Sequence, residues 1–197
     1  MNKESIADFY KDDVVNHDGF LWKELNNQKK DKLQKQLKEK GKQIVMTQPA
    51  MAKDLINTID FKEDEKVLDP CRGDGAFYDN LPWYVERDWC EVNDGRDFMD
   101  YTSKVNTIIS NPPFVPRKLF WNFHLKAMDI ATDRIYWLVN ASCINVFTPN
   151  RMFLMHNLSW YIQKIQIVQD KRWFGRYMLI KFGRENKGFV DYIPTKY

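Results

Sequence analysis

The sequence predicts an α/β protein with a doubly wound, mostly parallel sheet and an antiparallel hairpin near its C-terminal end. From residue 43 onward, short apolar runs of strand length alternate with segments whose apolar residues recur three or four positions apart. Strands that alternate with helices in this way form parallel sheets that are covered on both faces. The chain has 197 residues, of which 44% are hydrophobic, and this suffices for one domain with its own core.

The expected elements follow one another from residue 50 to residue 182. Helices are predicted where the apolar spacing is helical, over residues 50–59, 76–81, 118–130 and 151–158. Strands are predicted at the short apolar runs, over residues 66–68, 89–92, 105–110, 135–139, 164–168 and 177–182. The last two strands are expected to form the antiparallel pair.

Residues 1–42 differ in composition from the rest, and we expect them to form a basic helical extension ahead of a domain at 43–197. Seven lysines crowd residues 29–42, and only Asp31 and Glu39 oppose them. A second basic stretch lies near the C-terminal end, between residues 164 and 187. Two basic segments around a near-neutral middle suit a polyanionic ligand, and solvated lysines on an exposed helix explain the first segment equally well.

Composition argues against several classes of protein. No window approaches 18 uninterrupted apolar residues, so a membrane-spanning helix is not expected. The N-terminus is charged where a signal peptide has its apolar stretch, so a cytoplasmic location is expected. The three cysteines form no C-x-x-C pair and no histidine lies near them at ligand spacing, so we expect neither a disulfide framework nor a metal site.

A loop with two glycines, LDPCRGDGAF at residues 68–77, follows the first predicted strand. Ligands of open α/β sheets bind beyond the carboxyl ends of the strands, and Gly73 and Gly75 let the backbone approach a ligand closely. A dinucleotide fingerprint needs a small residue where Tyr78 stands, which weakens the interpretation as an NAD site. Glu91 lies 18 residues beyond Gly73, near the spacing of a carboxylate that binds ribose hydroxyls, so a nucleoside ligand is favoured.

Asn111-Pro112-Pro113-Phe114 directly follows the predicted strand at 105–110. The two prolines stiffen the turn and remove backbone donors, which leaves carbonyl groups and the amide oxygen of Asn111 as acceptors. Such acceptors suit an exocyclic amino group with two hydrogens, and the ring of Phe114 can stack on the planar ring that carries it. An Asx-Pro turn with a core phenylalanine is the alternative for an isolated motif. The glycine loop, the glutamate at ribose spacing and the strand-end position together favour the functional interpretation.

With these two motifs in this order, the chain resembles the class I S-adenosylmethionine-dependent methyltransferases that act on adenine N6 in nucleic acid. Their signature is [DNS]-P-P-[FYW], preceded by a D-P-x-x-G-x-G cofactor loop, and the resemblance covers about residues 43–182. It implies a Rossmann-like class I methyltransferase fold and S-adenosyl-L-methionine as the cofactor. The D-P-x-x-G-x-G form and the lack of an RNA-binding appendage favour DNA over RNA as the substrate.

The resemblance also implies which residues contact the cofactor. The full set is Thr47, Gln48, Pro49, Asp69, Pro70, Gly73, Gly75, Phe77, Glu91, Val92, Asp97, Phe98 and Asn111. Asp69 and the two loop glycines would hold the methionine moiety, and Glu91 the ribose hydroxyls. Asp97 and Phe98 would contact the adenine. Residues 47–49 resemble the family's T-P segment near the methionine end, with one extra glutamine between Thr and Pro.

The catalysis that the resemblance implies is direct methyl transfer at the turn Asn111-Pro112-Pro113-Phe114. The Asn111 side chain and the Pro112 carbonyl would accept both hydrogens of the target amine and so concentrate charge on its nitrogen. Phe114 would stack on the target base, which leaves its helix to be reached. This chemistry requires neither a metal nor a general base of shifted pKa.

Contacts with nucleic acid are expected at two places. One is the late loop with Lys171, Arg172, Trp173 and Phe174, where base stacking and core packing are equal alternatives for Phe174. The other is Arg117, just past the catalytic turn, where a phosphate contact and a solvated helix start are the alternatives.

No separate target-recognition domain is expected, because residues 97–111 are too few for an insertion and 15 residues follow residue 182. We therefore expect weak sequence selectivity, or recognition supplied by the N-terminal extension, by a protein partner or by a homodimer. Three other functions fit the same motifs. They are methylation of adenine in RNA such as ribosomal RNA, methylation of a protein glutamine, and nucleic-acid binding without catalysis. The basic segments speak against the second function, and the intact motifs against the third.

Overall fold

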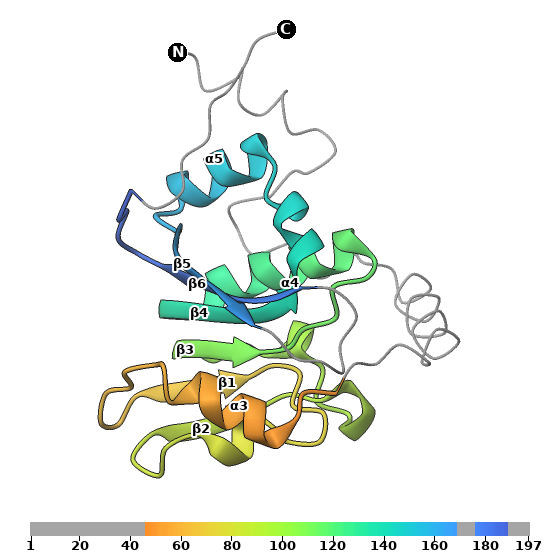
Figure 1. Cartoon of the computed structure of the whole chain (residues 1–197), viewed down its shortest axis with the longest axis vertical. Coiled ribbons are helices and arrows are strands. Elements are labelled where there is room, and N and C mark those ends of the chain that lie inside the picture. Colours follow the sequence, from red (N-terminus) through yellow and green to blue (C-terminus); the bar gives the residue numbers. More distant parts are fainter. Residues whose placement is uncertain (1–45, 169–175, 189–197) are drawn as a thin grey trace, which may run out of the picture. The chain divides into compact units, whose positions relative to one another are not determined.

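The computed structural model describes residues 46–168 and 176–188, whose centre is a six-stranded sheet with the strand order β2-β1-β3-β4-β6-β5 (Figure 1). The strands are β1 Lys66–Asp69, β2 Glu86–Trp89, β3 Val105–Ser110, β4 Ala131–Asn140, β5 Tyr161–Val168 and β6 Tyr177–Gly183. The extension expected at residues 1–42 and the late loop at 171–174 lie outside the described residues.

Strands β2, β1, β3 and β4 run parallel to one another, whereas β6 is antiparallel to both β4 and β5. The predicted fold class is therefore confirmed, including the C-terminal antiparallel hairpin. Because β1 lies between β2 and β3, the chain first moves to one side of β1 and then continues on the other. Ligands of open α/β sheets bind at the carboxyl ends of the strands where the order reverses in this way.

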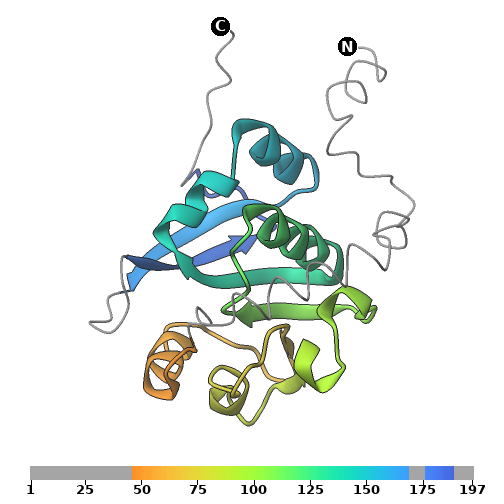
Figure 2. The same cartoon turned by 90° about the vertical axis from the view of Figure 1, so that its right-hand side faces the viewer.

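Helices cover both faces of the sheet. On one face, helix α3 (Pro49–Ile56) packs into the same buried cluster as Leu138 of β4. On the other face, Phe120 of helix α4 (Arg117–Ile130) lies edge-on against Trp137, the strand neighbour of Leu138. Figure 2, which looks toward the carboxyl ends of the parallel strands, shows α3 and α4 on opposite sides of the sheet.

Shorter elements fill the connections. Helix α5 (Pro149–Asn157) precedes β5 and packs against it. Four 3₁₀ turns are present among the described residues: η3 Tyr78–Asn80, η4 Val92–Asp94, η5 Phe98–Asp100 and η6 Ala141–Val146.

Two predicted elements differ from the structure. The strand predicted at residues 89–92 is β2 at Glu86–Trp89, because this edge strand carries charged residues and lacks the apolar run on which the prediction relied. The helix predicted at 76–81 is only the turn η3. The side chain of Asn80 donates to the Ala76 carbonyl at 2.9 Å, and Pro82 follows two residues later, so the chain turns away before a full helix forms.

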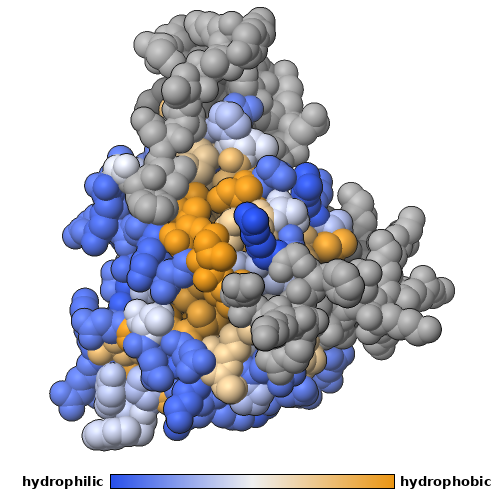
Figure 3. Space-filling model, viewed as in Figure 1, coloured by the Kyte–Doolittle hydropathy of each residue, from blue (hydrophilic) through white to orange (hydrophobic). Residues whose placement is uncertain are grey.

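The core on the α3 face is one cluster of buried apolar side chains. Its members are Ala52, Leu55, Ile56, Ile59, Phe61, Val67, Ala76, Phe77, Leu81, Val85, Ile109, Tyr136, Leu138, Tyr177 and Leu179. Figure 3 shows an apolar band over the middle strands of this face, with hydrophilic residues on either side. Since each fully buried large apolar side chain contributes about 1.5–3 kcal/mol, this cluster holds α3 firmly against the sheet.

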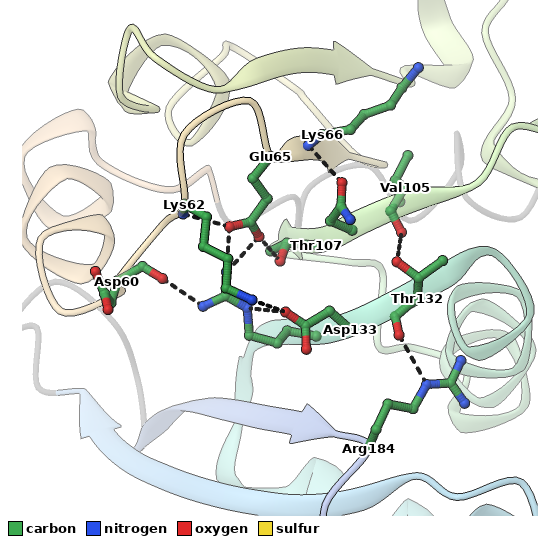
Figure 4. A network of polar contacts seen from close by, with 11 residues as sticks. Asp60, Lys62, Glu65, Lys66, Val105, Thr107, Thr132, Asp133 and Arg184 are labelled. Carbon is green, nitrogen blue, oxygen red and sulfur yellow. Dashed lines mark hydrogen bonds and ion pairs between the residues drawn. The ribbon is translucent and has the colours of Figure 1, made fainter.

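A buried polar network closes the amino ends of the parallel strands (Figure 4). Arg134 of β4 donates to both carboxylate oxygens of Glu65, at 2.5 and 2.6 Å, and to the Asp60 carbonyl at 2.7 Å. The hydroxyl group of Thr107 on β3 donates to the same carboxylate, and so does the backbone N–H of Lys62, at 2.9 Å. Buried charges are tolerated when they are paired in this way.

Candidate active site

Two loops leave the sheet side by side at the carboxyl ends of its parallel strands, which are called the carboxyl edge below. They follow β1 and β3, which are parallel neighbours with Leu68 paired to Ile108. The hydroxyl group of Ser110, the last residue of β3, donates to Asp69 Oδ1 at 2.7 Å, and both residues are buried. The glycine loop and the N-P-P-F turn, which come from distant parts of the sequence, are therefore joined by a direct hydrogen bond.

Asp69 ends β1 and is 1% exposed. Its Oδ1 atom also accepts from the backbone N–H of Cys71 at 3.3 Å. The backbone N–H of Tyr78 lies near the carboxyl group of Asp69 and favours its charged form. The Oδ2 atom of Asp69 makes no hydrogen bond of good geometry within the described residues. Because burial disfavours the charged form, the pKa of Asp69 is raised to about 7. The site therefore contains a buried acceptor that a cationic or hydrogen-bonding ligand group would satisfy.

The glycine loop has a backbone that side chains would disturb. Gly73 and Gly75 have φ angles of +52° and +87°, where residues with a Cβ are strained. A Cβ on Gly73 would come within 2.9 Å of Met46 Cε, and one on Gly75 within 2.6 Å of an Asp79 carboxylate oxygen. The positive φ angles therefore favour glycine at both positions of the loop.

Glu91 ties the glycine loop to the segment after β2. Its Oε2 atom accepts from the backbone N–H of Gly73 at 2.9 Å, and its Oε1 atom accepts from that of Asn93 at 3.1 Å. Each carboxylate oxygen can accept a further hydrogen bond, so this fixed carboxylate can also bind hydroxyl groups. The position predicted for a ribose contact is thus adjacent to the loop predicted to hold the cofactor.

Asn111 connects the N-P-P-F turn with the segment that precedes α3. Its Nδ2 atom donates to the hydroxyl oxygen of Thr47 at 3.2 Å, across 64 positions of sequence. Gln48 is the N-cap of α3 and Pro49 its first residue, so the three residues predicted near the methionine end lie directly before the helix or begin it. Thr47 is therefore brought to the N-P-P-F turn.

The remaining residues of the turn are held against the core. Pro112 is buried, Pro113 is half-buried, and Phe114 packs partly against the apolar cluster on the α3 face. The ring of Phe114 meets Tyr177 at the start of β6 edge-on, with 6.4 Å between the ring centroids. Arg117, predicted to meet phosphate, is exposed at the first position of α4, close behind the turn.

The structure gives the other predicted cofactor residues different environments. Phe77 and Phe98 are 3% and 2% exposed; Phe77 belongs to the core cluster, and Phe98 packs against Phe123. Asp97 accepts from the backbone N–H of Met99 at 2.9 Å and so begins η5. Val92 is 49% exposed at the start of η4. Pro70, which follows Asp69 directly, is buried, and this fixes the direction in which the loop leaves β1.

Sequence reasoning missed two residues of this edge. The sequence indicates Ser110 only as the end of an apolar strand, although a polar residue just before the N-P-P-F turn is a signal for a site residue. Tyr177 had no such signal, because it meets Phe114 only through the pairing of β6 with β4.

A hollow of about 290 Å³ lies elsewhere, lined by Glu63, Trp83 and Tyr84. These residues precede β1 and β2, so the hollow is at the amino ends of the strands and away from the residues above. Polar groups converge on the carboxyl edge, and we therefore place the candidate site there.

In the part of the chain that the structure describes, no three His, Cys, Asp or Glu side chains gather in a way that could bind a metal ion. Within residues 46–168 and 176–188, no helix has the length and apolar composition needed to cross a membrane.

Several solved methyltransferase structures have a similar fold. A Listeria monocytogenes protein assigned to the class I S-adenosylmethionine-dependent methyltransferases has a TM-score of 0.57 and 13% identity, covering 89% of this chain and 73% of that one. Trm5b from Pyrococcus abyssi has a TM-score of 0.52 and 14% identity, and the match covers 71% of this chain and 50% of Trm5b. Magnesium protoporphyrin IX methyltransferase from Synechocystis PCC 6803, solved with bound S-adenosylmethionine, has a TM-score of 0.50 and 8% identity. The match covers 70% of this chain and 78% of that one.

No protein-family model and no curated protein sequence matches the chain. At such low identities the likeness concerns the fold alone. The chain has the class I methyltransferase fold, as its sequence predicts.

Proposed function

We propose that this protein transfers a methyl group from S-adenosyl-L-methionine to the exocyclic N6 amine of adenine in DNA. The observation that carries the proposal is the junction at the carboxyl edge. There, Ser110 donates a hydrogen bond to Asp69 and Asn111 donates one to Thr47, so hydrogen bonds join the glycine loop, the N-P-P-F turn and the segment before α3.

The residues at this edge fit the proposed cofactor. Asp69 offers a buried carboxyl oxygen to the positively charged methionine end, and the glycine loop lets the ligand approach the backbone. Glu91 is held where its carboxylate can accept from ribose hydroxyls. When bound, S-adenosylmethionine supplies a methyl group on an electron-poor sulfur. A protein of the same fold was solved with this cofactor bound.

The N-P-P-F turn fits a flat aromatic amine. The amine nitrogen of adenine is a poor nucleophile because its lone pair is shared with the ring. Asn111 Oδ1 and the Pro112 carbonyl would accept its two hydrogens, and Phe114 would stack on the ring. Such acceptors hold the nitrogen in place and favour the charge that develops on it, and the surplus proton then leaves to solvent.

The choice of DNA and the source of target recognition belong to the proposal as well. The D-P-x-x-G-x-G form of the loop favours DNA over RNA. We propose that a protein partner, a second copy of the chain or the basic N-terminal extension supplies target selection.

The test is methyl transfer from labelled S-adenosylmethionine, with separate pools of DNA, RNA and glutamine-containing peptide. We expect N6-methyladenine in the DNA pool, identified by nucleoside mass spectrometry. Asn111→Ala should lower the rate by about 100- to 1,000-fold, as loss of one preorganised polar group commonly does.

Asn57→Ala is the matched control, because Asn57 is exposed at the end of α3 and lies outside the carboxyl edge. Its rate should equal that of the wild type. Methyl label found only in RNA or only in the peptide would show that DNA is not the substrate. Binding of DNA without any methyl transfer would indicate a non-catalytic module.

A further inference from the structure

The segment before α3 departs from the T-P pattern that the sequence resembles, and the departure changes what Thr47 can do. With Pro49 at the first position of the helix, the residue directly before it is the N-cap. In a T-P segment that residue would be threonine, whose hydroxyl group commonly caps the helix. Here the extra Gln48 occupies the N-cap and makes no side-chain capping bond. The hydroxyl group of Thr47 lies one residue further out, where it accepts from Asn111.

Thr47 is held in this place by the core. Pro49 favours an extended backbone for the residue before it, and Gln48 has φ −74° and ψ 135°. Ala52 of α3 and Ile109 of β3 are both fully buried in the same apolar cluster. The helix that follows Thr47 and the strand that precedes Asn111 are therefore fixed to each other.

The bond matters because the two ends of an asparagine amide are alike in shape and opposite in hydrogen-bonding character. Rotation about the last side-chain torsion of asparagine is soft, so the direction of the amide must be fixed by its partners. Donation from Nδ2 to Thr47 turns Oδ1 away from Thr47. A target amine needs an oxygen acceptor and would be repelled by the NH₂ end.

We infer that Thr47 is a positioning residue, whose hydroxyl group holds the Asn111 amide so that Oδ1 faces the target amine. This inference rests on the proposed function, and it assigns Thr47 a role that differs from a contact with the cofactor. Because Gln48 occupies the N-cap position, the hydroxyl group of Thr47 is not at the position that caps α3 and can bond to Asn111 instead.

The test compares Thr47→Val, which removes the hydroxyl group at nearly constant shape, with Thr47→Ser, which keeps it. A positioning role predicts that Thr47→Val lowers kcat by about 10- to 100-fold, since misplacing a catalytic group commonly has an effect of this size. Thr47→Ser should stay within about threefold of the wild type, and the Kd for S-adenosylhomocysteine should be unchanged in both variants. Thr58→Val is the matched control, because the Thr58 hydroxyl group bonds to the Leu55 carbonyl at the far end of α3.

A second arm of the test uses Asn111→Asp. Both carboxylate oxygens of aspartate are acceptors, so either one can face the target amine and Thr47 is not needed to orient the group. In this background Thr47→Val should lower the rate by less than about threefold, which is the signature of coupling between the two residues. Should Asn111→Asp be inactive, the first arm decides alone.

Each outcome points in one direction. A weaker Kd with unchanged kcat in Thr47→Val would replace the positioning role by a cofactor contact. Unchanged values of both, or equal losses in the Val and Ser variants, would overturn the inference while leaving the proposed function intact. Absence of methyl transfer by the wild-type chain would instead overturn the proposed function.

Discussion

A buried carboxyl group lies at each end of strand β1, and the two groups differ in how completely they are hydrogen-bonded. Glu65, just before the strand, is 5% exposed, and Arg134 donates to both of its oxygens. Asp69, at the other end, is 1% exposed, and only one of its oxygens makes hydrogen bonds of good geometry within the described residues. The two groups lie at opposite ends of one short strand, so the difference comes from what surrounds them.

The comparison separates a structural carboxylate from one that a ligand can complete. At the amino edge both oxygens of the buried Glu65 carboxylate are hydrogen-bonded, so no acceptor of this group is left for another molecule. At the carboxyl edge an acceptor is buried without full compensation, which lowers the stability of the protein and creates a place for a positively charged group. The raised pKa of Asp69 is a direct consequence of this arrangement.

The largest expected effect comes from breaking the pair at the amino edge. Arg134→Met leaves Glu65 buried without its cation, and we expect the free energy of unfolding to fall by about 3–5 kcal/mol. Denaturant titration measures this change. The double variant Glu65→Met, Arg134→Met should regain most of the loss, because no uncompensated charge is left.

Lys62→Ala is the control for charge at the same edge. Lys62 pairs with Asp133 at 3.8 Å, and the Lys62 side chain is 78% exposed, so the loss should stay below about 1 kcal/mol. A loss below that value for Arg134→Met as well would show that the two edges do not differ as described.

A smaller effect of opposite sign is expected for Asp69→Asn. The folded protein holds the Asp69 proton up to about pH 7, whereas the unfolded chain releases it near the ordinary value of 3.8. The wild type therefore loses stability as the pH rises from about 4 to 7, and the amide variant does not. At pH 8 we expect the variant to be more stable by about 1–3 kcal/mol, since its buried NH₂ group offsets part of the gain.

The same variant tests the ligand role of Asp69. Its affinity for S-adenosylmethionine at pH 8 should fall by about 10- to 100-fold, the size of a lost charge-assisted hydrogen bond. Titration calorimetry measures the affinity, and thermal unfolding at pH 5 and pH 8 measures the stability. A variant that is less stable at pH 8 and binds as well as the wild type would make Asp69 a structural residue like Glu65.

The smallest expected effect concerns Glu91→Gln. The amide keeps an oxygen for one of the two backbone N–H groups that Glu91 binds, so the free energy of unfolding should change by less than about 1 kcal/mol. Loss of the charge should weaken binding of S-adenosylmethionine by about tenfold. Equilibrium binding measures this, with the nearby Asp94→Asn, on an exposed residue of η4, as the control.

Much of the fold could be predicted from the sequence, and the two errors have clear causes. The strand at Val105–Ser110 coincides with its apolar run, since a buried parallel strand reads as continuous apolar residues. Strand β2 was misplaced by three residues because half of it is exposed at the sheet edge. For the site, the sequence predicted the glycine loop and the N-P-P-F turn, because each is a local pattern of residues that constrain the backbone.

The sequence by itself determined the order of the elements, the two stiff loops and the chemical groups that they carry. Only the tertiary structure decided which of these groups meet. Asn111 bonds to Thr47 across 64 positions, and Ser110 bonds to Asp69 across 41. The different environments of Glu65 and Asp69 likewise depend on which neighbours the folded sheet brings to each end of β1. Local patterns are set by backbone geometry along the chain, whereas burial and pairing are set by packing between segments that are far apart in the sequence.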